Sequence, residues 1–107
     1  MTMASAQKQE ADRIREEYHR REREIGSDFY SLQKPSNLFV RHGQERALLR
    51  ALTRGGCLPL ENKRILEVGC GRGQWFATFE TLGARRENLY GIELDAERGA
   101  ACAERVP

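Results

Sequence analysis

The N-terminal part of the chain carries apolar side chains at helical spacing, separated by many charged ones. Residues 4–25 contain no proline or glycine and place a narrow apolar stripe along one side, which predicts a helix that rests one face on the domain. The stripe consists of Ala11, Ile14, Tyr18 and Ile25. Charged residues at helical spacing, such as Asp12 with Arg15 and Glu16 with Arg20, are expected to pair along this helix.

A polar segment follows and contains two adjacent aromatic residues, Phe29 and Tyr30. We expect this pair to be buried by core packing, with a ligand wall as the alternative, because large aromatic side chains favour burial. A second helix is predicted from residue 36 or 37 to Thr53, and Gly43 inside it is expected to split it into two pieces.

From residue 63 the pattern changes to short apolar runs that alternate with helical ones. The predicted elements are a strand over 63–68, a helix over 73–82, a strand over 89–94 and a helix over 96–105. Trp75, Phe76, Phe79 and Leu82 give the first of these helices its apolar face, and Asp95 can cap the second. Strands separated by helices run parallel, so we expect a buried first strand in an α/β fold with a doubly wound parallel sheet, preceded by two helical segments.

Composition and charge exclude several classes of function. The net charge is +2, from 18 basic and 16 acidic residues, and no region is basic enough to indicate nucleic-acid binding. No apolar run approaches the ~20 residues of a membrane span, and the first residues lack the apolar core of a secretory signal. Three cysteines at irregular spacing indicate reduced thiols and a cytoplasmic location, and no metal-ligand spacing is present.

Three glycines at alternate positions follow the first predicted strand directly. Gly69, Gly71 and Gly73 would allow the backbone to approach a ligand at the junction between a strand and a helix. Glu67 lies inside the strand, where a carboxylate needs a partner such as a ligand ammonium. Glu93 ends the next strand, the position from which an acid accepts hydrogen bonds from ribose hydroxyls in doubly wound folds.

The spacing of these glycines distinguishes between cofactors. A dinucleotide fingerprint has glycines at its first, third and sixth positions. Counted from Gly69, the third position is Gly71 but the sixth is Gln74. Together with the acid two residues before the first glycine, this favours a ligand with an amino-acid part and a nucleoside part over one with a pyrophosphate.

The sequence EVGCGRG at 67–73 resembles the first motif of the class I S-adenosylmethionine-dependent methyltransferases, and GIELD at 91–95 resembles their second-strand motif. The resemblance covers residues 63–107 and implies a Rossmann-like sheet. The cofactor-binding positions that it implies are Glu67, Gly69, Cys70, Gly71, Gly73, Glu93 and Leu94. In this family the acid in the first motif would hold the methionine ammonium, the acid after the second strand the ribose, and Leu94 would lie against adenine.

The resemblance implies methyl transfer to an acceptor, for which we expect a small molecule. We expect 1–62 to form a helical lead-in or lid and 63–107 to form the first two strand–helix units of the domain. Members of the family continue through further strands, so this chain is interpreted as part of a longer enzyme and would itself bind the cofactor weakly without turnover. The catalytic residues are unknown, with His42 and Tyr30 as the candidates for a general base.

Two other functions remain open at this point. A nicotinamide-dependent Rossmann oxidoreductase would use a similar strand, loop and strand. A non-catalytic helical interaction module, joined to an incomplete Rossmann-like piece, would instead use the charged helix over 4–25.

Overall fold

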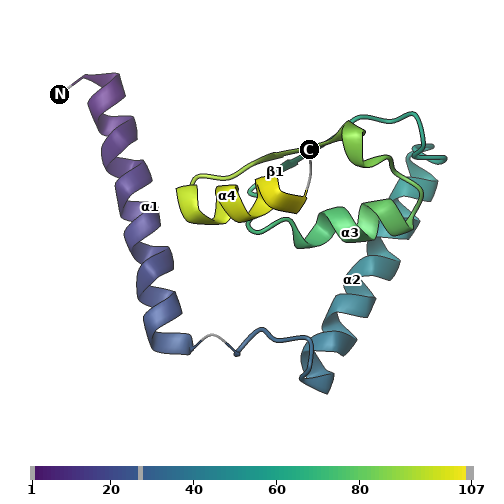
Figure 1. Ribbon diagram of the computed structural model, residues 1–107, viewed down its shortest axis with the longest axis horizontal. Helices are drawn as coiled ribbons and strands as arrows, with labels where there is room; N and C mark the ends of the chain where they lie inside the picture. Colours follow the sequence, from purple (N-terminus) through teal and green to yellow (C-terminus); the bar gives the residue numbers. More distant parts are fainter. Residues whose placement is uncertain (1, 27, 106–107) are drawn as a thin grey trace. The chain divides into compact units, whose positions relative to one another are not determined.

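The computed structural model describes residues 2–26 and 28–105, which form helices and a pair of parallel strands (Figure 1). In chain order the elements are α1 (Met3–Ile25), α2 (Pro35–Arg54), β1 (Ile65–Val68), α3 (Gln74–Thr81), the 3-10 helix η1 (Arg86–Asn88), β2 (Leu89–Ile92) and α4 (Ala96–Arg105). The chain divides into two compact units, one up to His42 and one from Gly43 onward. The second half of α2 therefore belongs to the unit that contains the strands.

α1 covers the predicted span and is stabilised mainly by interactions between residues close in sequence. Thr2 caps it, because its hydroxyl oxygen accepts a hydrogen bond from the Ser5 N–H at 3.2 Å. The ion pairs of the helix include Arg15 with Asp12 at 3.1 Å, Arg20 with Glu17, and Arg20 with Glu24 at 2.5 Å. The first pair confirms the prediction. Glu16 was the expected partner of Arg20, but Arg20 instead pairs with Glu17 and Glu24. None of the described residues of α1 is buried.

The aromatic pair before α2 contradicts the expectation of core burial. Phe29 and Tyr30 pack against each other with ring centroids 4.7 Å apart in an edge-to-face arrangement. Both rings are exposed, and 73% of the Tyr30 surface is accessible. The edge-to-face contact therefore shields part of each ring without the support of a hydrophobic core.

α2 is one continuous helix, so the expected break at Gly43 is wrong. It begins at Pro35, whose ring fixes a φ angle that suits the first turn of a helix. The side-chain amide of Asn37 donates hydrogen bonds to the carbonyl oxygens of Phe29 at 2.7 Å and of Ser31 at 3.0 Å, which anchors this first turn to the preceding segment. A single glycine costs a helix only about 1 kcal/mol, which the remaining turns of α2 offset.

β1 and β2 confirm the predicted parallel pairing in the described part of the chain. Ile65 lies opposite Leu89, and Val68 lies opposite Ile92. Side chains alternate between the two faces of a strand. One face therefore carries Ile65, Glu67, Leu89 and Gly91, and the other carries Leu66, Val68, Tyr90 and Ile92.

The first of these two faces is the covered one. Phe76 of α3 is 1% exposed and packs close to Gly91 of β2, and α4 also contacts β2. The buried core consists of Leu60, Cys70, Phe76, Ala84, Leu89 and Cys102. On the opposite face Leu66 is 57% exposed and Val68 is 77% exposed. The prediction that β1 is a buried strand is therefore wrong for this face.

The residues at the helix ends have roles that suit their types. Asp95 is buried and caps α4, because its Oδ1 accepts a hydrogen bond from the Glu97 N–H at 2.9 Å. Gly83 follows α3 with a φ of 104°, a conformation that suits the end of a helix and favours glycine. No helix in the described residues is long and apolar enough to cross a membrane.

Candidate functional site: the glycine loop

The loop between β1 and α3 takes a left-handed backbone conformation at alternate residues. The φ angles are 73° at Gly69, 57° at Gly71 and 80° at Gly73. A side chain is strained at such angles, so each of these positions requires or strongly favours glycine. A Cβ atom built on Gly69 or Gly71 would meet no atom within 4 Å. The glycines therefore serve the backbone conformation and leave open space above the loop.

Hydrogen bonds hold this loop against the end of β2. The N–H groups of Gly69 and Cys70 both donate to the Ile92 carbonyl oxygen, at 2.7 and 3.1 Å. The Gly73 N–H donates to the Cys70 carbonyl oxygen at 2.9 Å, which closes the turn into α3. The loop is thus fixed to both strands at the edge where their carboxyl ends meet, the usual place for a ligand in an open α/β sheet.

Glu93 connects the strand end to the loop. Its Oε2 accepts a hydrogen bond from the Gly71 N–H at 2.9 Å, and its Oε1 accepts a longer one from the Asp95 N–H at 3.3 Å. A carboxylate offers about four acceptor sites, so two such bonds orient the group and leave acceptor capacity for a ligand. The sequence placed this acid near the glycines but did not predict its hydrogen bond to the loop.

Glu67 lies on β1 with its Oε2 atom buried. It lines a cavity of about 470 Å³ in the second unit. The other lining residues are Gln44, Ala47, Leu48, Leu66, Trp75 and Phe79. The cavity therefore combines one acid and one amide with aliphatic and aromatic walls, a composition that suits a small, largely apolar ligand.

Cys70 and Leu94, two further predicted cofactor-binding residues, differ in their exposure to solvent. Leu94 lies two residues after the end of β2 and is partly exposed, so it remains accessible to a ligand. The Cys70 side chain is turned into the core, where its Sγ lies 3.2 Å from Cys102 Sγ. Burial, the hydrogen bond with Cys102 and the nearby carboxylates raise the pKa of the Cys70 thiol to about 12. The Cys70 thiol is therefore neutral at ordinary pH and packs as a core side chain.

Gly91 has a structural role that the sequence did not predict. A Cβ atom at this position would lie 2.6 Å from Cys70 Sγ and 3.0 Å from both Cys70 Cβ and Phe76 Cζ. The absence of a side chain thus allows the loop and α3 to pack onto β2. A glycine inside a strand is the sequence signal for such a close approach.

The candidates for a general base lie in the first unit. Tyr30 precedes α2 and His42 lies within it, and both are exposed. A role of either side chain as a general base therefore remains a prediction. Within the described ranges, no group of three or more His, Cys, Asp or Glu side chains is arranged to hold a metal ion.

Comparison with known proteins does not assign a function to this site. No family model matches the chain, and neither the curated proteins nor the solved structures contain a significant match. The site therefore has to be interpreted from its own residues.

Proposed function

We propose that the chain forms part of an S-adenosylmethionine-dependent methyltransferase with a Rossmann-like sheet, in which the glycine loop binds the methyl donor. The observation that carries this proposal is the left-handed conformation of Gly69, Gly71 and Gly73 at the carboxyl end of two parallel strands. Glu93 supports it further, because its carboxylate is already oriented by the loop itself.

Open space next to the loop supports the approach of such a ligand. The space above Gly69 and Gly71 is free of other atoms to at least 4 Å from a built Cβ, so a ligand can approach the backbone there. The loop leads into the N-terminus of α3, where backbone N–H groups and the helix dipole favour a negatively charged or electron-rich group.

Three side chains would complete the cofactor site. Glu67 would face the ammonium of the methionine part, and its half-buried position would strengthen that attraction relative to water. Glu93 would use its remaining acceptor sites for the ribose hydroxyls. Leu94, partly exposed after β2, would cover one face of the adenine. These roles follow from the family resemblance.

The bound donor would supply a methyl group on a positively charged sulfur that leaves readily. The protein then contributes mainly alignment and the exclusion of water. The cavity beside Glu67 supports a small acceptor with an apolar body, because most of its wall is aliphatic or aromatic. A cytoplasmic location belongs to the same proposal and is supported by the three free thiols.

The uncovered face of the strand pair supports a sheet larger than the two strands described. Leu66, Val68, Tyr90 and Ile92 are all exposed there. Parallel sheets are ordinarily buried on both faces. We therefore propose that helices cover this face in the enzyme and that further strands extend the sheet at its edges.

Calorimetric titration of the 107-residue chain with S-adenosylmethionine, S-adenosylhomocysteine and NAD tests the assignment. We expect the two sulfur ligands to bind and NAD to bind more weakly, because position 74 lacks the third glycine of a dinucleotide site. Preferential binding of NAD would instead indicate an oxidoreductase.

A matched pair of variants, in each of which one glutamate is replaced by glutamine, shows whether binding uses the proposed site. Glu93→Gln should weaken S-adenosylhomocysteine binding about tenfold, the effect of losing hydrogen bonds to a charged acceptor. Glu87→Gln alters an exposed acid of η1 and should leave binding unchanged. Equal losses in both variants would place the ligand elsewhere. Trp75 fluorescence, which reports on α3, confirms that each variant remains folded.

A further inference from the structure

Two cysteines far apart in the sequence meet in the core beneath the glycine loop. Cys70 belongs to the loop and Cys102 to α4, and their sulfur atoms lie 3.2 Å apart. The two side chains are only 5% and 4% exposed. Both are free thiols in this structure. The fold therefore holds two thiols in direct contact, although they are 32 positions apart in the sequence.

Gly91 makes room for this contact. Its missing side chain leaves the space in which Cys70 Sγ lies, because a Cβ atom there would be 2.6 Å from that sulfur. Gly69 and Gly71 flank Cys70 with positive φ angles and nothing within 4 Å of a built Cβ. The Cys70 sulfur therefore lies close to the backbone of Gly91, whereas the backbone on either side of Cys70 faces open space.

A cavity of about 290 Å³ reaches both thiols. Cys70 and Cys102 line it, together with Leu89, Tyr90, Gly91, Glu93, Gly99 and Ala103. A water molecule occupies about 30 Å³ in the liquid, so a molecule of similar size has ample room in this cavity. Hydrogen peroxide is such a molecule, and it can approach the sulfur atoms from this side.

We propose that Cys70 and Cys102 form a reversible disulfide under oxidising conditions and thereby link the glycine loop to α4. The sulfur atoms need to approach from 3.2 Å to the bond length of about 2.05 Å. This inference does not depend on methyl transfer, since it rests on the two thiols and their surroundings alone.

Hydrogen peroxide is the oxidant in the proposed reaction. One thiolate attacks a peroxide oxygen, the O–O bond breaks, and the products are a sulfenic acid and, after protonation, water. The second thiol then attacks the sulfenic sulfur, the S–S bond forms, and the hydroxyl leaves as a second water with the proton of that thiol. Two electrons pass from the sulfur pair to the peroxide in total.

Three titratable groups that face Cys70 bear on the rate. Cys102 of α4, Glu67 of β1 and Glu93 after β2 face Cys70, and with burial they raise its pKa to about 12. Because a thiolate is the attacking species, we expect slow oxidation at neutral pH and faster oxidation as the pH rises.

Peptide mapping of the full chain after peroxide treatment tests the proposal. Cleavage after arginine and lysine places the three cysteines on separate peptides, over 55–63, 65–72 and 99–105. After native oxidation, alkylation in denaturant and digestion, we expect peptides 65–72 and 99–105 to be joined and about 2 Da lighter than their sum, because two hydrogen atoms are lost. A thiol reductant should separate them.

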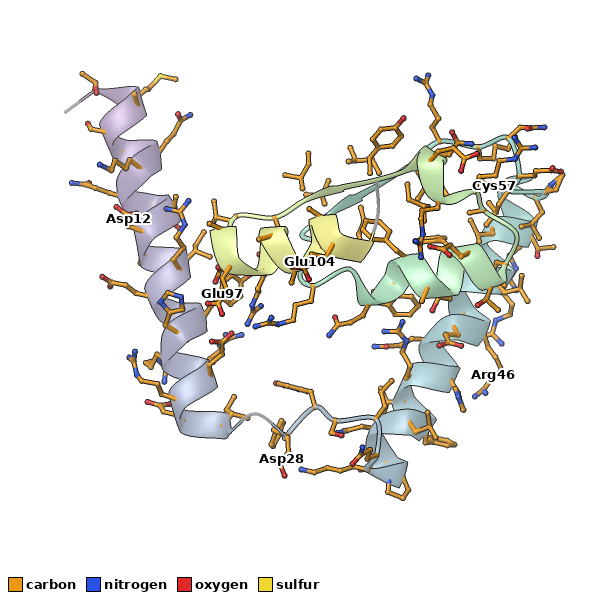
Figure 2. All side chains as sticks on the ribbon, in the orientation of Figure 1. Asp12, Asp28, Arg46, Cys57, Glu97 and Glu104 are labelled. Atoms are coloured by element: carbon orange, nitrogen blue, oxygen red, sulfur yellow. The ribbon has the colours of Figure 1, made fainter. Side chains whose placement is uncertain are left out.

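Cys57 provides the internal control. It lies three residues after the end of α2, well away from α4, which Glu97 and Glu104 mark in Figure 2. The linked peptides should therefore form equally in a Cys57→Ser variant. Recovery of peptides 65–72 and 99–105 as separately alkylated or separately oxidised species, or joined only to peptide 55–63, would overturn the proposal. So would a link that forms only when the chain is oxidised in denaturant.

Discussion

Both faces of the strand pair carry apolar side chains, but their surroundings are opposite. On one face, Leu89 is almost completely buried and Phe76 of α3 packs beside it in the core. On the other face, Val68 and Leu66 remain mostly exposed. The apolar pattern of the strands therefore does not decide which side is buried, and the neighbouring helices determine which side is covered.

This difference shows where the stability of the second unit arises. Burial of apolar area stabilises by roughly 25 cal/mol per Å², so the covered face contributes much more than the exposed one. The glycine loop lies at the edge of the covered face, and its conformation depends on that packing through Cys70 and Gly91. Stability of the core and geometry of the candidate site are consequently linked.

The largest expected effect comes from the centre of the covered face. Phe76→Ala should lower the free energy of unfolding by about 3–5 kcal/mol, because it removes a fully buried ring and leaves a cavity. Val68→Ala on the exposed face should change it by less than about 1 kcal/mol. Urea unfolding followed by Trp75 fluorescence measures both. Similar losses in the two variants would mean that both faces are packed in solution.

A smaller loss is expected at the contact between β2 and the loop. Gly91→Ala places a methyl group against Cys70 and Phe76 and should destabilise the second unit by about 1–3 kcal/mol. Gly43→Ala in α2 adds a methyl group with only an ordinary contact to Arg46 and should stabilise the helix by about 0.5–1 kcal/mol. The same urea experiment distinguishes the two, and a stable Gly91→Ala protein would contradict the close approach described for this strand.

The smallest effect is expected in α1, which lacks buried residues in its described part. Arg20 and, more weakly, Arg21 lower the pKa of Glu17 to about 2. This carboxylate therefore stabilises the helix above its ordinary pKa of 4.5, and the contribution disappears as the pH falls from 4.5 towards 2. Exposure keeps the contribution small.

Amide hydrogen exchange in α1 measures this effect. Glu17→Gln should slightly increase exchange near neutral pH and remove the corresponding acid dependence, whereas Glu16→Gln should leave exchange almost unchanged. An effect of Glu16→Gln as large as that of Glu17→Gln would show that the ion pairs of this helix in solution differ from those described above.

Local patterns predicted the helices well. α1 begins one residue before its predicted start, and α4 matches its predicted range, because caps and charge pairs act between residues three or four apart. Gly43 misled the prediction for α2, since a propensity of about 1 kcal/mol per residue is too weak to break a long helix by itself.

Interactions between distant residues could not be predicted. The sequence placed the three glycines and Glu93 near one sheet edge, but it did not indicate that Gly71 donates a hydrogen bond to Glu93. The contact of Cys70 with Cys102 has no signal in the sequence, because two lone cysteines reveal nothing of their distance. Which face of β1 is covered likewise depends on segments outside the strand.

The most direct test of the proposed cofactor site is nuclear magnetic resonance of the ¹⁵N-labelled chain during titration with S-adenosylhomocysteine. The amide signals of Gly69, Gly71 and Gly73 should shift in a saturable manner, because the ligand is expected to lie against this backbone. Those of Gly26 and Gly43 should remain in place. The absence of any shift in the three loop glycines at millimolar ligand, or shifts confined to residues outside the loop, would contradict the assignment of this loop as the methyl-donor site.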